Sequence, residues 1–163
     1  MNTHLQLVRQ LQNATEISPP DHAGAAHLAD MDIIHYQAAL MAGGSETFNA
    51  LKAGDTEQIL RGLTDIAYYA LAAIARRGEQ VTQHPVSWRH DGFVISLMRL
   101  LSDKINQCAT GRADHYSDLY CVCSHLASSF LNADFDKAFQ TVCRHKSSPL
   151  NKQPLDLSDC LFE

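Results

Sequence analysis

Residues 55–77 read DTEQILRGLTDIAYYALAAIARR, and they have the features of a long helix that other elements must cover. Asp55 has the position of an N-cap, with Gln58 three residues later, an arrangement that starts a helix running to about Arg77. From Ile66 to Ala75 the stretch is apolar almost all the way round, and a face of that kind needs partner surface. We therefore expect a buried helix in a bundle, and a dimer that supplies part of the covering surface.

The residues before this stretch predict a helix that glycines interrupt. Apolar side chains recur at the three-or-four spacing of a helix that buries one stripe, at positions 28, 31, 34, 38 and 41. Gly43 and Gly44 weaken that helix, because each glycine costs about 1 kcal/mol relative to alanine in a helix interior. Ser45 can then cap a renewed helix. We expect two shorter helices here, over 27–41 and 45–53.

The rest of the chain adds further helices and no strands. The predicted elements are, in chain order, an opening helix around Leu5–Leu11 stopped by Ser18-Pro19-Pro20-Asp21, a connector over Gln80–Gly92, a helix from Phe93 to about Ala109 ended by Gly111, a helix from Asp114 or His115 to about Leu131, and a short helix from Phe135 to Cys143 capped by Asp134. No stretch shows sustained apolar and polar alternation between hairpin turns. The fold class is therefore all-α, a four-helix-bundle-like fold with extra short helices, in which two helix pairs around 38–75 and 95–131 form the bundle.

The composition is that of one acidic, folded domain. The chain has 163 residues, of which 45% are apolar and 19% are charged, so it is neither disordered by composition nor a coiled coil. We expect a single helical domain over residues 1–146 and a polar tail over 147–163. The 13 Lys and Arg against 18 Asp and Glu give a net charge of -5, which argues against a nucleic-acid-binding groove.

The targeting and cysteine patterns indicate a cytoplasmic protein. Residues 1–12 lack the basic start and the continuous apolar run of a signal peptide, and no apolar stretch reaches the roughly 20 residues that a membrane span needs. The five cysteines are an odd number without a CxxC pair, which argues against a disulfide framework or a zinc ribbon. We expect reduced thiols, with Cys108, Cys121 and Cys123 as small buried hydrophobes.

Two carboxylates, Glu46 and Asp65, lie next to apolar helix faces, where an unpaired charge is costly to bury. Oxygen ligands suit Mg²⁺, and Mg²⁺ in turn carries phosphates, so one interpretation is that both carboxylates converge on this ion from neighbouring helices. The other interpretation is structural: Asp65 faces solvent, or pairs with Arg61 one helical turn away.

Three runs in this region resemble the MazG-like all-α nucleoside triphosphate pyrophosphohydrolases, namely Tyr36–Leu40, Ser45–Asp55 and Gly62–Leu71. Asn132–Val142 resembles the closing segment of that family, and the resemblance covers residues 28–146. It implies Mg²⁺ as the cofactor and a nucleoside triphosphate as the ligand. It also implies a reaction in which a metal-activated water attacks a phosphorus and releases a monophosphate and pyrophosphate.

The family motifs EExxE and ExxD are incomplete in this chain. Glu46 matches the last acid of EExxE, while the two preceding acids fall at Ala42 and Gly43, which cannot ligate a metal through a side chain. Asp65 matches the acid that ends ExxD, and the glutamate of that motif falls at Gly62. Two of the five expected carboxylates remain, so the resemblance assigns ligands for a metal but no complete catalytic set.

Two further assignments come with the resemblance. An alternative register places Asp32 and His35 on the first motif, which makes Asp32 a third candidate metal ligand. After the last helix many relatives carry a basic segment that addresses the nucleotide, and here Arg144 and Lys146 are the candidate phosphate contacts.

Two functions remain open on the sequence. The first is a Mg²⁺-dependent nucleoside triphosphate pyrophosphohydrolase. The second is a catalytically degenerate relative that binds a nucleotide or a protein partner, or serves as a structural dimer. The acids missing at positions 42, 43 and 62 favour the second function, whereas the retained Glu46 and Asp65 favour the first.

Overall fold

A computed structural model of the chain describes residues 2–14, 28–148 and 153–162, and the regular secondary structure of these residues is helical apart from one isolated bridge between Ala133 and Leu161. The helices are α1 (Thr3–Ala14), α2 (Asp30–Ala53), α3 (Thr56–Arg77), α4 (Val94–Gln107), α5 (Ala113–Ser129) and α6 (Phe135–Ser147), with short 3-10 helices η1 (Cys108–Thr110) and η2 (Ser158–Cys160). The predicted all-α, bundle-like fold is confirmed. The predicted stop at Ser18-Pro19-Pro20-Asp21 lies outside the described residues.

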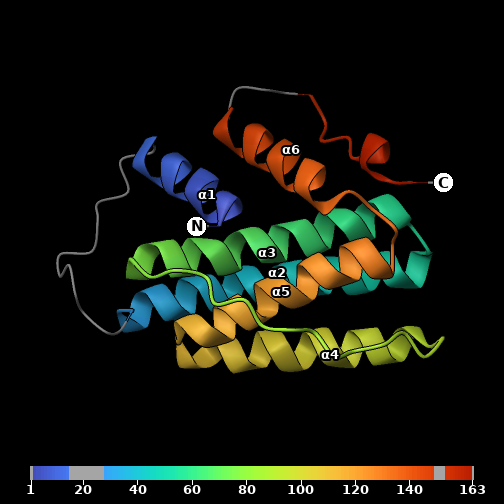
Figure 1. Cartoon of the computed structure of the whole chain (residues 1–163), viewed down its shortest axis with the longest axis horizontal. Coiled ribbons are helices and arrows are strands. Elements are labelled where there is room, and N and C mark those ends of the chain that lie inside the picture. The colour runs from blue at the N-terminus through green and yellow to red at the C-terminus, as the bar shows by residue number, and fades with distance from the viewer. Residues whose placement is uncertain (1, 15–27, 149–152, 163) are drawn as a thin grey trace.

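The long helices α2 to α5 lie side by side. Helices α1 and α6 cross α3 on its side away from α4 (Figure 1). Helix α3 is the centre of the fold, because α1, α2, α5 and α6 all pack against it. Asp55 caps α3 as predicted, by accepting a hydrogen bond from the backbone N–H of Gln58 at 3.1 Å. In the described part of the chain, no helix combines the length and the apolar character that a membrane crossing requires.

The apolar stretch of α3 is covered from within the chain. Its buried residues are Ile66, Ala67, Ala70, Leu71, Ala72, Ala73 and Ile74. The four helices that surround α3 supply the surface that the sequence analysis assigned to a dimer partner. The argument for a dimer from residues 66–75 is therefore wrong, although this does not bear on a dimer formed through another surface.

Helix α2 is continuous, so the predicted break at Gly43-Gly44 is also wrong. Both glycines are buried inside a helix of 24 residues. A Cβ atom built on Gly43 would lie 2.9 Å from Cγ1 of Ile66 in α3, and one built on Gly44 would lie 3.0 Å from Cδ1 of Ile105 in α4. The glycines thus let the backbones approach closely, and the packing gained offsets their poor helix propensity.

The buried face of α2 also differs from the predicted stripe. Met31 is 73% exposed, Ile34 58% and Met41 61%, although the sequence predicted that all three are buried. The face that packs inward carries Tyr36, Leu40, Gly43, Gly44, Thr47 and Ala50. Helix α2 therefore has apolar side chains on two opposite faces, and the face with the small residues lies against α3 because it allows the closer approach.

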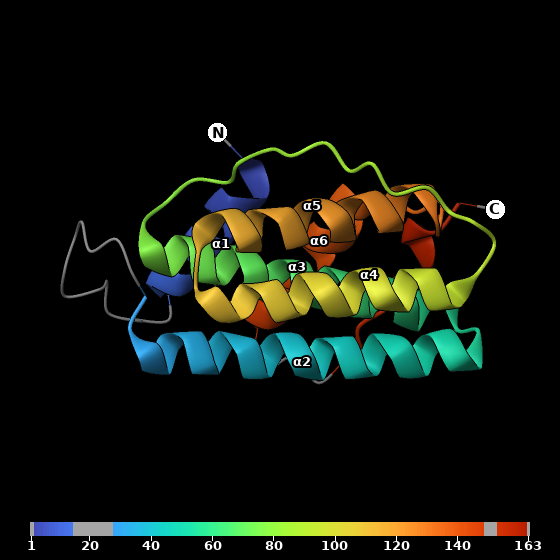
Figure 2. The ribbon, with the colours of Figure 1, turned by 90° about the horizontal axis from the view of Figure 1, so that it is seen from below.

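The connector between α3 and α4 runs as a strap along α5 (Figure 2). The backbone N–H of Thr82 donates to Oγ of Ser117 at 3.1 Å, and Val81, Val86 and Trp88 pack partly buried against the core. The strap has no helix or strand, in agreement with the predicted connector over Gln80–Gly92.

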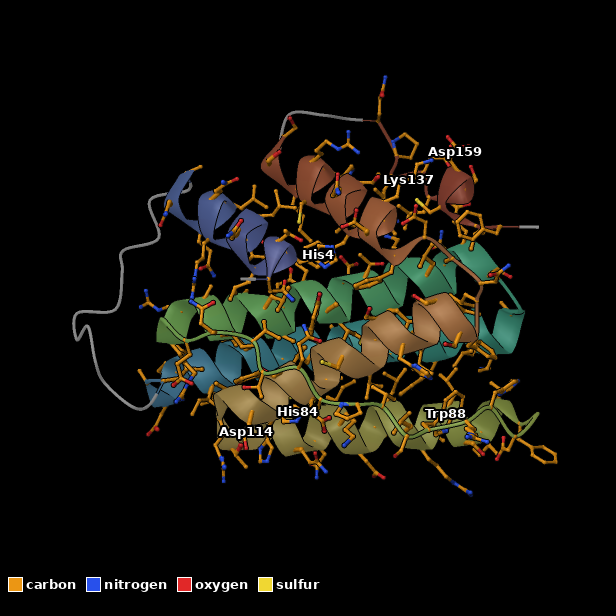
Figure 3. The ribbon with its side chains drawn as sticks, viewed as in Figure 1. His4, His84, Trp88, Asp114, Lys137 and Asp159 are labelled. Atoms are coloured by element: carbon orange, nitrogen blue, oxygen red, sulfur yellow. The ribbon has the colours of Figure 1, made fainter. Side chains whose placement is uncertain are left out.

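The end of the predicted polar tail packs on the bundle. Leu157 and Cys160 are buried, and the N–H of Leu157 donates to Oε1 of Glu57 at 3.0 Å. In Figure 3, Lys137 of α6 lies beside Asp159 of η2, and its ammonium donates to the carbonyl of Asp159 at 3.2 Å. Residues 153–162 are therefore anchored to α3 and α6.

All five cysteines are free and buried. Burial raises the pKa of the Cys108 thiol to about 12 and that of Cys143 to about 11. These two thiols are therefore protonated at neutral pH. The prediction that Cys108, Cys121 and Cys123 are small buried hydrophobes is confirmed, and Cys143 and Cys160 are buried as well.

Candidate functional site

Two of the positions where the MazG-like motifs would carry carboxylates, 43 and 62, lie in a close contact between α2 and α3. A Cβ atom on Gly62 would lie 2.1 Å from Oγ1 and 3.1 Å from Cα of Thr47. Thr47 is fully buried, and its hydroxyl donates to the carbonyl of Gly43 at 2.7 Å. At positions 43 and 62 the chain therefore has a helix–helix contact in place of two acids.

Position 42 differs from the two glycines. Ala42 is exposed on α2, so a longer side chain could stand there without disturbing the contact with α3. Of the three positions where the resemblance expects an acid and the chain has none, one is on the surface and two are in a packed interface. Position 42 alone could carry an acid without moving a helix.

Glu46 lies at the edge of a cavity of about 410 Å³ between the second half of α2 and the first half of α3. The polar side chains that line this cavity belong to Glu46, Asn49, Asp55, Gln58 and Arg61. Among the described residues, the side chains of Glu46, Asn49 and Arg61 form no hydrogen bond or ion pair with one another or with a neighbour. Asp65 is not part of the lining.

Asp65 points to α6 and pairs with Lys146, whose Nζ atom lies 3.3 Å from Oδ1. The same ammonium lies 4.8 Å from the ring centroid of Tyr68 and 4.9 Å from that of Tyr69. Burial raises the pKa of Tyr68 to about 12, so the ring under the ammonium stays uncharged. The structural interpretation of Asp65 is corrected, because its partner is Lys146 and not Arg61 or solvent.

The other candidate residues lie apart from this pair. Asp32 forms an ion pair with Arg76, at 3.4 Å between Oδ2 and Nε, and His35 packs edge-on against the ring of Tyr36. Arg144 lines a separate cavity of about 300 Å³ between α1 and α6. The described residues contain no group of three or more His, Cys, Asp or Glu side chains that could hold a metal ion.

The donor set does not fit a shared Mg²⁺ ion. Asp65 faces the ammonium of Lys146, Asp32 faces the guanidinium of Arg76, and Glu46 lines a cavity that neither of them enters. Magnesium is bound by carboxylates that meet at one point, with waters and phosphates filling the other positions. Here a lysine already neutralises Asp65, the carboxylate that matches the end of ExxD.

A polar cluster that the sequence did not indicate joins three helices at His4. Nδ1 of His4 lies 2.8 Å from Oη of Tyr120 in α5, and Nε2 lies 2.7 Å from Oδ1 of Asp136 in α6. The imidazole stacks on Phe139, with 4.3 Å between the centroids. Figure 3 shows His4 at the point where α1 meets α6.

The chemistry of this cluster is that of a structural joint. Asn2 donates to Oη of Tyr120 at 3.3 Å, so a neutral His4 that donates from Nε2 to Asp136 and accepts at Nδ1 satisfies every member. Burial raises the pKa of Tyr120, which keeps its phenol protonated at neutral pH and makes it a poor nucleophile. The cluster fixes α1 to α5 and α6. The only signal for this cluster in the sequence is the presence of a histidine, His4, in the opening helix.

No family model, curated protein or solved structure matches this chain. The likeness to the MazG-like enzymes therefore rests on the sequence runs quoted above, and the fold is known from the helices described here.

We expect the pair between Asp65 and Lys146 to stabilise the fold more than an exposed pair does. Lys146→Met keeps the aliphatic stem over the tyrosine rings but removes the charge, and it should lower the free energy of unfolding by about 1 kcal/mol. A double-mutant cycle with Asp65→Asn, followed by urea unfolding, measures the coupling.

Arg112 and Asp114 provide the matched control, because they form a pair at 2.8 Å whose side chains are 66% and 43% exposed. The cycle of Arg112→Met with Asp114→Asn should give a coupling of at most about 0.3 kcal/mol. Equal couplings for the two pairs would mean that the tyrosine rings and the partial burial add nothing.

Proposed function

We propose that this chain is a catalytically degenerate relative of the MazG-like pyrophosphohydrolases that acts as a homodimeric interaction module in the cytoplasm. One observation carries the proposal: the contact of Gly62 with Thr47 occupies the place where the family motif requires a carboxylate. Five buried free thiols are in keeping with a reducing compartment.

The chemistry of pyrophosphate release supports the same conclusion. The reaction needs several carboxylates to hold the ions, to offset the repulsion among phosphates and to orient the attacking water. Glu46 and Asp65 lie in different environments, and Lys146 neutralises Asp65. A water positioned by Glu46 alone would be poorly oriented, and poor orientation costs orders of magnitude in rate.

The second candidate is the Mg²⁺-dependent hydrolysis of a nucleoside triphosphate, and the cavity beside Glu46 favours it. That cavity is within the size range of ligand pockets, and Arg61 there has no partner among the described residues. A guanidinium of this kind is suited to bind a phosphate. In this reading Glu46 would be the Mg²⁺ ligand nearest the substrate, and Arg144 and Lys146 would not take part, because they lie at other places.

A pyrophosphate-release assay separates the two candidates. We expect no release above background from canonical or modified nucleoside triphosphates with Mg²⁺ or Mn²⁺. Glu46→Ala and Asp65→Ala are the controls, because they remove the two retained motif acids. Release that both variants abolish would contradict the proposal. Release that neither variant changes would come from a contaminating enzyme and would leave the proposal intact.

A further inference from the structure

The outer face of α2 carries an uncovered apolar stripe. Its positions recur at alternating steps of three and four residues, which is the heptad spacing of a coiled-coil seam. They are the exposed Met31, Ile34, Ala38, Met41 and Ser45, and Phe48, which is partly buried against the core. In Figure 2, α2 forms one edge of the bundle, and its other side lies against α3 and α4. Exposed methionine and isoleucine side chains in one line are unusual for a free surface.

We propose that this stripe is the dimer interface, where α2 packs antiparallel against α2 of a second copy about a two-fold axis near Ala39 and Leu40. The proposal gives the homodimer of the proposed function a specific surface, and it rests on that function only in this respect. An isologous interface of this kind needs a stripe that is complementary to itself.

The side-chain sizes make the stripe self-complementary in the antiparallel orientation. Such pairing places Ile34 opposite Ser45 and Ala38 opposite Met41 of the second copy, so a large residue meets a small one in the central layers, while Met31 meets Phe48 in the two outer layers. A parallel arrangement would place Ile34 against Ile34 and Ser45 against Ser45, which alternates crowded layers with voids. Knobs-into-holes packing therefore favours the antiparallel pair.

The charges at the two ends of the stripe agree with this orientation. Asp30 and Lys52 are both exposed and have no partner among the described residues. The antiparallel register brings Asp30 opposite Asn49 and within one helical turn of Lys52 of the second copy. A parallel register would bring Asp30 against Asp30. The opposed helix dipoles add to the same preference.

The area of the interface extends beyond α2. The stripe is about 26 Å long at 1.5 Å per residue, and one helix pair of that length falls short of the roughly 800 Å² per partner of a stable interface. The N-terminal end of α4 lies at the same end of the bundle as the C-terminus of α2 (Figure 1). Phe93 and Val94 are exposed at this end, and in the proposed dimer they would add apolar area to the interface.

The first test measures the mass of the full chain in solution by light scattering and sedimentation. The wild-type chain should be a dimer, and Ile34→Glu/Met41→Glu should raise the dissociation constant at least about 100-fold, because it places four carboxylates in an apolar seam. Its circular dichroism spectrum should match that of the wild type. Phe162→Glu is the control, because Phe162 is 58% exposed and its backbone N–H is bonded to the carbonyl of Asn132, between α5 and α6.

The second test fixes the orientation. The native thiols are buried, so a cysteine introduced on the stripe is the reactive one under mild oxidation. A mixture of the Ile34→Cys and Ser45→Cys chains should form the mixed disulfide preferentially. The charge reversal Asp30→Lys should weaken the dimer, and Asp30→Lys/Lys52→Asp should restore it.

Three results would overturn the interface: a monomeric wild-type chain, a dimer that Ile34→Glu/Met41→Glu leaves intact, or crosslinking of Ile34→Cys only with itself. These results are independent of the hydrolysis assay. A dimer that releases pyrophosphate in a manner dependent on Glu46 and Asp65 would contradict the proposed function and leave the interface standing. A monomer without activity would overturn the interface and the homodimeric part of the proposed function, and would leave only the proposed loss of catalysis standing.

Discussion

Gly62→Ala is expected to lower the free energy of unfolding by about 2 kcal/mol, although alanine is the better helix former by about 1 kcal/mol. The new Cβ would lie 2.1 Å from Oγ1 and 3.1 Å from Cα of Thr47. Thr47 is β-branched, fully buried and bonded to the carbonyl of Gly43, so it cannot rotate away without losing that bond. The two helices must move apart, and thermal or urea unfolding measures the cost.

Gly44→Ala is the matched control, because it is the same substitution at a buried position of the helix that packs on α3. Its Cβ would lie 3.0 Å from Cδ1 of Ile105, the flexible end of a side chain. We expect this variant to be as stable as the wild type or more stable by up to about 1 kcal/mol. Gly43→Ala should fall between the two, since its Cβ would meet Cγ1 of Ile66 at 2.9 Å. Equal effects at positions 44 and 62 would show that helix propensity, and not close packing, determines the change in the free energy of unfolding.

The same contact bears on function, because Gly62→Glu would be needed to restore the second motif. A glutamate at this position has the same Cβ as alanine and a charged group beyond it in a packed interface, so it should destabilise the fold further. Recovery of the motif therefore requires compensating changes at Thr47 and in the spacing of α2 and α3. In physical terms, the absence of a carboxylate at position 62 and the close packing on Thr47 are one feature.

The sequence alone was sufficient to predict where two helices start, because a single capping residue determines each start. Asp55 and Asp134 each accept the bond from the N–H three residues ahead, as predicted for caps. Gly43 and Gly44 led to the wrong prediction of a break, because helix propensity describes an isolated helix. In the fold these glycines stabilise α2 through close contacts with Ile66 of α3 and with α4. Contacts of this kind depend on a neighbour that is distant in sequence.

The face that α2 buries could not be predicted from periodicity for a related reason. Both faces of α2 have apolar spacing, so the hydrophobic pattern does not decide between them. The choice depends on how closely α3 can approach, which favours the face with glycine and threonine. The stripe left outside is then the surface that a second copy can cover.

The candidate site shows the same limit. The sequence identified Asp65 as a carboxylate that needs a partner, which is correct. It could not identify Lys146, because that contact depends on the crossing of α6 over α3, which no local pattern encodes. Lys146 was assigned to a phosphate and Asp65 to a metal, whereas in the fold each neutralises the other.

His4→Ala is expected to lower the free energy of unfolding by about 3 kcal/mol and to loosen α1 selectively. The substitution removes both hydrogen bonds of the imidazole, leaves the hydroxyl of Tyr120 without its acceptor and opens a void above Phe139. Hydrogen exchange of the α1 amides is the direct measurement, since protection there should fall more than in α3.

Two variants separate the contributions at this joint. His4→Phe keeps a ring over Phe139 but loses both bonds, so it should recover about half of the stability that His4→Ala loses. Asp136→Asn keeps an oxygen that accepts from Nε2 of His4, and Asp136 is 62% exposed in its pair with His4, so its cost should stay below about 0.5 kcal/mol. If His4→Phe were as unstable as His4→Ala, the hydrogen bonds alone would hold α1. If neither His4→Ala nor His4→Phe reduced the protection of the α1 amides, the contacts of Leu5 and Val8 with the core would be sufficient to dock this helix.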